Sequence, residues 1–542
     1  MRKSLILAIV PLAVAALALP SAAAPGPAAT DTATSLATQP NPEHIATLKA
    51  VLQTMKDNYP RFARQTPGPQ DVFDYNLGDL WLSGIDGSGT TIALIEGWDD
   101  PDINTVIHNF DARYGLPDPD IQTIFPSGPL PAECPAGMVA LQSYGSCDAW
   151  MGELRLDVEA AHLIAPYAKI LISASPADSE ITDDTPFQVA MPELMHSVEF
   201  ISENHLADSM SISDGTGEAT YSDLAQIHSQ DPGPLTAAAD GVPVIVATGD
   251  CGVVQNLAVA NAQCGTTTTT PDTAAWDDSP WVVAMGGSVP NVSTTDGSKL
   301  GPDPLWHAGI FSEGAGFSSV YARPDYQNNV KNVTGSDMRS VPDITMDSQD
   351  GTSESAPEFA GILALAAQLN GGRSVGPIND VLYRDLGPRG TRSGIEDVVS
   401  GNNSTTTVPG FTATNGFDVA SGWGTLDAST FVPALVNAVR GEHGNDTMQR
   451  QAAAALDKLQ HATLTSDNVP AGGTTYLLGS GFIPQHPVRF AIDGKQIATL
   501  TANNLGAVTS QIDPAALSLA PGTHTVTLSS MLLDESAGFR TR

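Results

Sequence analysis

Short apolar runs alternate with longer segments of helical spacing over most of the chain. Residues 91–95, 169–173, 244–247 and 281–285 are apolar runs of strand length, and helical stretches separate them. Parallel strands that are buried on both faces and joined by helices have this pattern. The sequence therefore predicts an α/β domain with a mostly parallel sheet covered by helices on both faces.

Other patterns occur toward the two ends of the chain. Residues 44–58 and residues 447–461 have the apolar spacing of helices. Between residues 472 and 528, short runs of alternating polar and apolar residues are separated by Gly, Pro and Asn turns. This last pattern predicts a small C-terminal all-β sandwich, for which we expect an immunoglobulin-like arrangement.

A candidate nucleophile precedes a long apolar run. The segment Gly351-Thr352-Ser353 comes before the apolar residues 359–369, so the Ser353 hydroxyl is expected at the N-terminal mouth of a buried helix. A serine at this position suits nucleophilic attack, although by itself it is more often a helix cap. The chain has no His-Gly-Thr-His segment to supply an imidazole base, so we expect the base to be a carboxylate.

A second helix offers that carboxylate. Residues 151–164 are expected to form a helix that stops before Pro166, with Glu153 and Asp157 four positions apart on one face. Two acids so close share a proton, and their repulsion leaves one as a base and the other as a hydrogen-bonded acid at mildly acidic pH. The simpler alternative is that Glu153 and Asp157 lie on a solvated helix face and have no catalytic role.

The chain is strongly acidic, with 60 Asp and Glu residues against 24 Lys and Arg and a formal net charge of -36. A charge of this sign argues against nucleic acid as a partner. With 41% hydrophobic residues the chain can fill a large core. The excess of carboxylates suits an acidic medium, in which many are protonated, but a compositional bias of the source organism explains it as well.

The first 24 residues have the pattern of a cleaved secretory signal peptide. Met1-Arg2-Lys3 precedes the apolar residues 5–19, and small residues follow. No later stretch has the roughly 18 consecutive apolar residues that span a bilayer. We therefore expect a secreted, extracellular protein without a membrane anchor, in which residues 25–65 are disordered or a short pro-segment.

Four cysteines fit an oxidising compartment. Cys134 and Cys147 are 13 positions apart, and Cys251 and Cys264 have the same separation. This spacing suggests two local disulfides, although four cysteines allow three pairings.

The motifs resemble, in their order along the chain, those of the sedolisins, a family of serine-carboxyl peptidases with a subtilisin-like fold. The segments that carry the resemblance are Gly89 to Glu96, Gly152 to Pro166, Ser211-Ile212-Ser213, Gly249-Asp250, Ser279 to Gly287, Gly316-Phe317-Ser318, Val341-Pro342-Asp343 and Gly351-Thr352-Ser353. They assign residues 66–440 to a sedolisin-like domain. Residues 441–461 are then a helical linker, and residues 462–542 form the sandwich.

The resemblance implies a role for each candidate residue. Ser353 would attack the peptide carbonyl, Glu153 would take its proton, and Asp157 would hold Glu153 in place. Asp250, in its protonated form, would complete an oxyanion hole, and Glu96 would support Glu153 through a further hydrogen bond. The expected protein is a monomeric serine-type endopeptidase with an acidic optimum that hydrolyses peptide bonds in proteins or peptides.

The resemblance also implies one structural calcium ion. Asp397 and Asp418 would bind it through their carboxylates, and Val398, Thr414 and Gly416 through their backbone carbonyls. Thr414 stands where the family usually has glycine. The plain alternative is a pair of turn aspartates in a loop rich in Gly and Asn.

Some residues depart from the family pattern. Only residues 344–350 separate Asp343 from Gly351, where the family has a longer insertion. Asp214 replaces a usual aromatic residue, and both Asp214 and Glu354 are expected to add carboxylates near the substrate. The N-terminal region is too short for the family's large pro-domain.

Two other classes of protein stay open. One is a catalytically inactive peptidase-fold binding protein, against which the presence of all four candidate catalytic residues argues. The other is a subtilisin-type enzyme, which would need a histidine base, and none of the 11 histidines lies in the required context.

Overall fold

The computed structural model describes residues 40–134, 146–175, 192–221, 223–255, 264, 270–441, 446–459 and 462–542. The predicted signal peptide and residues 25–39 lie outside the described residues.

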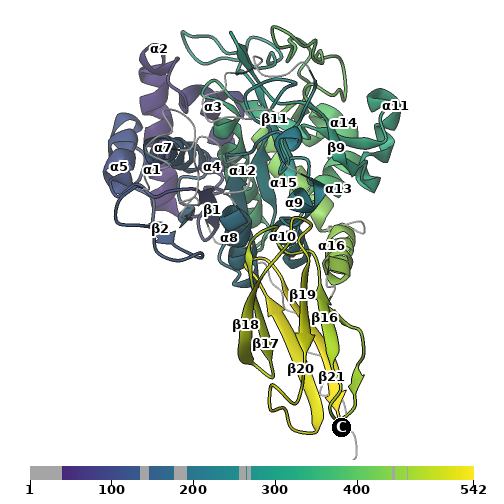
Figure 1. Ribbon diagram of the computed structural model, residues 1–542. Coiled ribbons are helices and arrows are strands. Elements are labelled where there is room, and N and C mark those ends of the chain that lie inside the picture. Colours follow the sequence, from purple (N-terminus) through teal and green to yellow (C-terminus); the bar gives the residue numbers. More distant parts are fainter. Residues whose placement is uncertain are drawn as a thin grey trace, which may run out of the picture. The chain divides into compact units, whose positions relative to one another are not determined.

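A seven-stranded sheet in the order β11-β6-β5-β4-β1-β3-β2 forms the centre of the large domain (Figure 1). Its strands are β1 (Thr91–Glu96), β2 (Ile121–Ile124), β3 (Lys169–Ala174), β4 (Ser209–Ile212), β5 (Val244–Ala247), β6 (Val283–Ser288) and β11 (Ile344–Asp347). Each neighbouring pair is parallel. The predicted α/β fold with a mostly parallel sheet is therefore confirmed.

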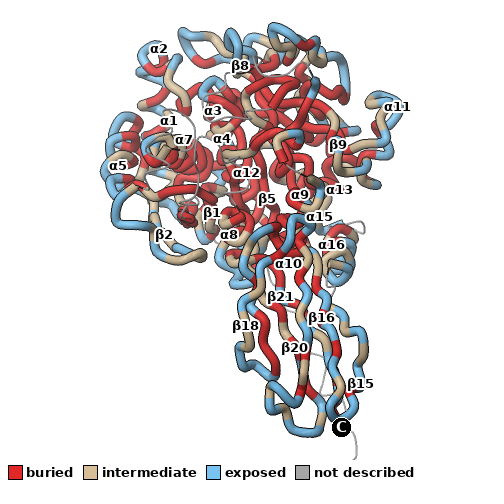
Figure 2. The backbone as a smooth tube through the Cα atoms, viewed as in Figure 1, coloured by how far each residue is buried: buried red, intermediate tan, exposed pale blue. Residues whose placement is uncertain are grey.

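Alternate residues of β1 face two different cores. Ile92 and Leu94 belong to one buried cluster with residues of α7 (Cys147–Ile164) and α12 (Thr352–Leu369). Ala93 and Ile95 belong to another cluster, on the opposite face of the strand. Figure 2 shows how completely α12 and β5 are enclosed. Helices thus cover both faces of the sheet, which explains why its strands are apolar throughout.

Further elements surround this centre. The other helices are α1 (Pro42–Asp57), α2 (Tyr59–Phe62), α3 (Pro69–Asp74), α4 (Leu77–Leu82), α5 (Ile103–Tyr114), α8 (Pro192–Glu203), α9 (Leu224–His228), α10 (Pro232–Asp240), α11 (Lys331–Thr334), α13 (Asn379–Val381), α14 (Gly387–Arg389), α15 (Ala428–Val439) and α16 (Asp446–Leu459). Short strand pairs join β7 (His307–Ala308) to β8 (Phe311–Ser312), β9 (Gly316–Ala322) to β10 (Met338–Val341), and β12 (Ile395–Glu396) to β13 (Thr425–Leu426).

Helix α1 lies inside the segment predicted to be disordered or a short pro-segment. Its residues Leu48, Val51 and Met55 are buried in the same core as Trp81. This part of segment 25–65 is therefore helical and packed, because its apolar face has a core to cover. Its role as a pro-segment stays a prediction.

Helix α7 begins earlier than its apolar spacing predicts. Ser146 caps it by accepting a hydrogen bond from the Ala149 amide at 3.1 Å, and Cys147 is its first residue. Cys147 is joined to Cys134, and Cys251 is joined to Cys264, so the two predicted local disulfides are confirmed.

Residues 462–542 form two small sheets. The three-stranded sheet contains β14 (Thr463–Leu464), β16 (Thr475–Gly479) and β19 (Val508–Ile512). The five-stranded sheet contains β15 (Asn468–Val469), β21 (Asp534–Thr541), β20 (Gly522–Ser529), β17 (Pro487–Ile492) and β18 (Lys495–Thr501). Side chains such as Leu477, Phe490 and Val526 share one buried cluster. The predicted small all-β unit is therefore present.

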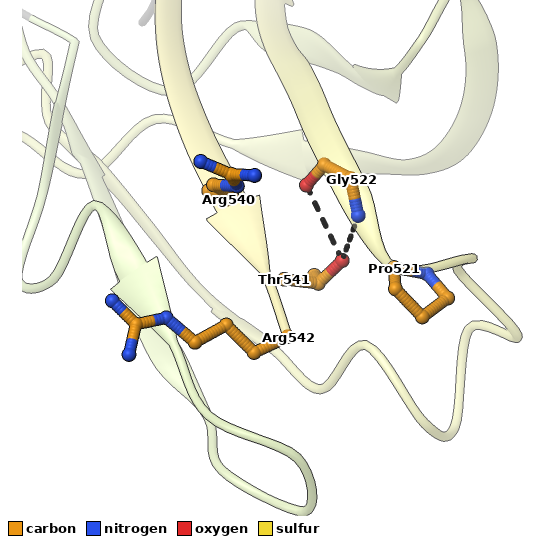
Figure 3. A pocket seen from close by; sticks show the side chains of 5 residues that line it. All are labelled: Pro521, Gly522, Arg540, Thr541 and Arg542. Atoms are coloured by element: carbon orange, nitrogen blue, oxygen red, sulfur yellow. Dashed lines mark hydrogen bonds between the residues drawn. The ribbon is translucent and has the colours of Figure 1, made fainter.

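A shallow hollow lies where β20 begins and β21 ends (Figure 3). Pro521, Gly522, Arg540, Thr541 and Arg542 line it, and the Thr541 hydroxyl accepts a hydrogen bond from the Gly522 amide at 3.1 Å. Within the described part of the chain, no helix is both long and apolar enough to cross a membrane.

Candidate active site

The ends of three neighbouring parallel strands bring the candidate residues together. Glu96 is the last residue of β1, Ser213 directly follows β4, and Asp250 lies three residues after β5. Ligands of open α/β sheets bind at this carboxyl edge. Helices α7 and α12 complete the site with Glu153, Asp157 and Ser353.

Ser353 occupies the first turn of α12. Its hydroxyl lies 3.4 Å from the Ser213 carbonyl oxygen, and it is close enough to the Glu153 carboxyl group to lower the pKa of that acid. The positive end of the helix dipole favours negative charge at this position. The predicted nucleophile and the predicted base are therefore neighbours.

Gly351 makes this helix start possible. It has φ of 100°, and a Cβ atom on it would lie 2.6 Å from Asp250 Oδ2. Both the positive φ and the close carboxylate require glycine.

Asp157 and Glu96 are two further acids of the site. Asp157 Oδ2 accepts a hydrogen bond from the Ser213 hydroxyl at 2.8 Å. Glu96 lies near Asp157, and burial and the charges of Asp157 and Glu153 raise its pKa. Neither carboxylate oxygen of Glu96 has a hydrogen-bond partner among the described residues, so the bond to Glu153 that the resemblance implied stays a prediction.

Burial keeps protons on these acids. It raises the pKa of Asp157 and of Glu96 well above their ordinary values, and the charges of the neighbouring carboxylates raise them further. Burial also raises the pKa of Glu153 to about 8, while the neighbouring Ser353 hydroxyl opposes that rise. Because a nearby hydroxyl stabilises the charged form, Ser353 favours placing a shared negative charge on Glu153.

Asp250 faces the start of α12 from the other side. Its Oδ1 atom accepts hydrogen bonds from the Thr352 amide at 2.8 Å and from the Thr352 hydroxyl at 3.0 Å. Burial raises the pKa of Asp250, and these two bonds reduce the rise. Its Oδ2 atom can carry a proton in acid and donate it toward a developing oxyanion.

Sequence reasoning gave no role to the side chains of Ser213 and Thr352. Both stand inside motifs that carried the family resemblance, but a motif does not tell which atoms its hydroxyls bond. Ser213 joins Asp157 to the nucleophile's helix, since its hydroxyl also lies 3.2 Å from the Ser353 carbonyl oxygen. Thr352 orients Asp250.

The two extra carboxylates have different fates. Asp214 lies beside the site: its charge contributes to the raised pKa of Glu153, and burial raises its own pKa to about 7. Glu354, in the first turn of α12, is fully buried. The expectation that Glu354 adds charge near the substrate is therefore wrong, because the residue after Ser353 points into the core.

Several oxygen atoms of the predicted metal loop accept no hydrogen bond from the described residues. Asp397 Oδ2 accepts a hydrogen bond from the Gly416 amide at 2.8 Å, while its buried Oδ1 atom has no partner among the described residues. Asp418 Oδ2 accepts from the Thr414 amide at 2.5 Å. Nothing in the described chain donates to the carbonyls of Val398, Thr414 or Gly416. These residues fit a hard cation that binds oxygen.

Comparisons with known proteins point to one family. No protein-family model matches the sequence. Kumamolisin from Bacillus sp. (strain MN-32) is 28% identical over 348 residues, which cover 59% of this chain and 55% of that protein. Sedolisin from Pseudomonas sp. (strain 101) is 29% identical over 250 residues, covering 42% of this chain and 40% of that protein. The chain thus spans about half the length of the curated relatives it matches.

A solved structure shares the fold. Pseudomonas sedolisin, described as a serine-carboxyl proteinase complexed with two molecules of pseudo-iodotyrostatin, aligns with a TM-score of 0.56 at 22% sequence identity. The alignment covers 68% of this chain and 98% of that chain. The relatives and the shared fold confirm the resemblance to the sedolisin family that the motifs predicted.

Proposed function

We propose that this chain is a secreted, acid-active serine-carboxyl endopeptidase. The observation that carries the proposal is the position of the Ser353 hydroxyl beside the Glu153 carboxyl group, with Asp157 and Glu96 next to them. A nucleophile beside a base, with further acids around that base, is the arrangement that covalent catalysis needs.

The reaction would begin with attack by Ser353 Oγ on the peptide carbonyl carbon. Glu153 takes the hydroxyl proton, and the carbonyl oxygen becomes an oxyanion that accepts a hydrogen bond from protonated Asp250. The C–N bond then breaks as Glu153 gives its proton to the leaving amine. Water, losing a proton to Glu153, attacks the acyl-serine ester, and the acid product leaves as the Ser353 hydroxyl forms again.

Activity is expected only over a limited range of pH, because this sequence of steps requires two protonation states at once. Glu153 must be ionised to accept a proton, whereas Asp250 must be neutral to donate a hydrogen bond. An oxyanion-hole donor contributes about 3 to 4 kcal/mol to the transition state. The rate should therefore fall on both sides of an optimum.

A structural calcium ion is part of the proposal. Asp397 and Asp418 would supply carboxylates, and Val398, Thr414 and Gly416 would supply carbonyl oxygens. When bound, the ion would tie residues 397–398 to residues 414–418 by neutralising two carboxylates. It takes no part in bond breaking.

The test is hydrolysis of a denatured protein from about pH 2 to pH 8 by the purified full chain. Ser353→Ala should abolish hydrolysis, while Ser355→Ala should not, because the Ser355 hydroxyl bonds only within the helix, to the Thr352 carbonyl. Internal cleavage of a substrate with a blocked N-terminus would establish endopeptidase activity. No hydrolysis by folded protein at any pH would favour the inactive, binding-protein alternative.

A further inference from the structure

A second group of acids is buried beneath α12, apart from the catalytic residues. We call Asp71 of α3, Asp347 of β11, and Glu354 and Glu358 of α12 the core acid cluster. All four have 0% exposure. One carboxylate oxygen from each of Asp71, Asp347 and Glu354 lies within 4.8 Å of the others. Burying several carboxylates together is costly unless something compensates their charge.

No cationic side chain supplies that compensation. Within the described ranges, none of the four acids forms an ion pair with Lys, Arg or His. Lys299 pairs instead with Asp74, Asp303 and Glu396, outside the cluster.

Backbone amides hold the first three acids in place. Asp71 Oδ2 accepts from the Gly68 amide at 2.7 Å, Asp347 Oδ1 from the Gln349 amide at 3.1 Å, and Glu354 Oε2 from the Asp350 amide at 3.1 Å. Asp71 Oδ1 and Glu354 Oε1 are buried and receive no hydrogen bond from any described residue. Asp71 and Glu354 are thus fixed through one oxygen and open at the other, whereas both oxygens of Asp347 accept hydrogen bonds, Oδ2 from the side chains of Gln349 and Gln70.

Glu358 and Gln70 add oxygens to the same space. Both carboxylate oxygens of Glu358 are buried without a hydrogen-bond partner in the described chain. Among the neighbouring charges, that of Glu358 raises the pKa of Asp71 most. The charges of Glu354 and Asp347 raise the pKa of Glu358 in turn, so Glu358 lies next to the other three acids. Gln70 donates from Nε2 to Asp347 Oδ2 at 3.4 Å, while its Oε1 atom has no partner there.

Repulsion within the cluster calls for added positive charge. Burial, together with the neighbouring carboxylates, raises the pKa of Asp71, Glu354 and Glu358 well above the ordinary range, and burial raises that of Asp347 to about 6. Tyr75, Asp74 and Asp350 also surround it, and none of them is a cation. Protons can supply the charge in acid, but near neutral pH another source is needed.

We propose that the core acid cluster binds a divalent cation, and calcium in preference to magnesium, through Asp71, Asp347 and Glu354, with Glu358 adding negative charge beside them. The donors are all hard oxygens, and the Gln70 amide oxygen provides one more. Oxygens up to 4.8 Å apart can all contact one calcium ion at its bond length of about 2.4 Å, whereas magnesium requires bonds of about 2.1 Å.

This site differs from the proposed metal loop, and its existence does not depend on peptidase activity. Its consequence would be structural. The ion would join α3 and β11 to the first two turns of α12, the helix that carries Ser353. Protons compete for the same oxygens, so calcium affinity should rise as pH rises.

Calcium binding by the full chain tests the proposal. We would strip metal with chelator, remove the chelator, and measure bound calcium per chain by equilibrium dialysis at pH 7, using Ser353→Ala protein to prevent self-digestion. Two ions per chain are expected, and one should remain after Asp397→Asn and Asp418→Asn remove the loop ligands. Adding Asp71→Asn to these changes should abolish the remaining binding, while adding Asp111→Asn, a buried acid outside both sites, should not.

Other outcomes would overturn the proposal. If the variant with Asp397→Asn and Asp418→Asn binds no calcium, the core acid cluster holds only protons. Retained calcium in the variant that also carries Asp71→Asn gives the same answer. Should Asp71→Asn fail to fold, Asp347→Asn takes its place, and the count of ions on the chain with an intact cluster decides independently. Magnesium at the same concentration should displace little calcium, and full displacement would contradict the stated preference.

Discussion

The Ser213 hydroxyl donates a hydrogen bond to Asp157 Oδ2 at 2.8 Å, joining the end of β4 to helix α7. Because the same hydroxyl lies 3.2 Å from the Ser353 carbonyl oxygen, one side chain contacts both catalytic helices. Ser213 therefore sets the position of the acid that stands behind the proposed base.

Ser213→Ala should lower kcat/KM about tenfold. Loss of the bond leaves a buried carboxyl oxygen unsatisfied, which costs about 1 to 3 kcal/mol, and about 1.4 kcal/mol of it in the transition state is tenfold in rate. The hydrogen bond from Ser213 lowers the pKa of Asp157, so its loss should raise that pKa. The acid limb of the plot of kcat/KM against pH should therefore shift. Ser211→Ala is the control, because the buried Ser211 hydroxyl has no partner among the described residues. Equal losses in both variants would argue against a positioning role.

Asp250→Asn should remove the alkaline limb of the pH profile. An amide donates a hydrogen bond at every pH, whereas the protonated acid loses its donor as pH rises through its raised pKa. The acid limb, which depends on ionisation of Glu153, should remain. The measurement is kcat/KM of wild type and variant from about pH 2 to pH 8. An unchanged alkaline limb would assign it to another group.

Stability should decrease as the pH rises above the ordinary carboxyl range. The folded pKa is raised to about 6 for Asp347, to about 7 for Asp214 and to about 8 for Asp303, while unfolded carboxyls titrate near pH 4. The folded state therefore binds more protons, so these groups stabilise fully below about pH 4. That stability is lost as the pH rises through 6 to 8, by about 1.4 kcal/mol for each pKa unit. Calorimetry in excess chelator should show Tm falling over this range, and a steady rise in Tm would contradict the assignment.

Removal of calcium from the proposed loop should lower Tm. Without the ion, the Asp397 and Asp418 carboxylates keep only hydrogen bonds from backbone amides and from the Ser421 and Thr414 hydroxyls, and they lose the ligand that would hold their loops together. Unfolding of the Asp397→Asn, Asp418→Asn variant should respond less to chelator than unfolding of wild type. An equal response in both proteins would place the stabilising ion elsewhere.

The sequence predicted the elements better than their side-chain contacts. The strand at 244–247 coincides with β5, because four buried apolar residues leave little choice of structure. The helix start at Cys147 was missed, since the capping contact of Ser146 depends on a hydroxyl that periodicity does not describe. Motif order identified Ser353, Glu153, Asp157, Asp250 and Glu96 as a set. The acids that surround Glu96 and the burial of Glu354 depend on how the helices pack against the sheet, which no local pattern contains.

The strand order also has a consequence for when the site can form. β1 pairs with β3 and with β4, so Ile92 meets Ile170 and Ser209, residues far along the chain. Closing such long loops is slow, because the entropy of closure is lost before the contacts compensate for it. Glu96 and Ser353 belong to distant parts of the chain, and neither has its partners until the strands between them are in register. A newly made chain would therefore carry every proposed catalytic residue and yet lack the proposed site until its sheet has closed.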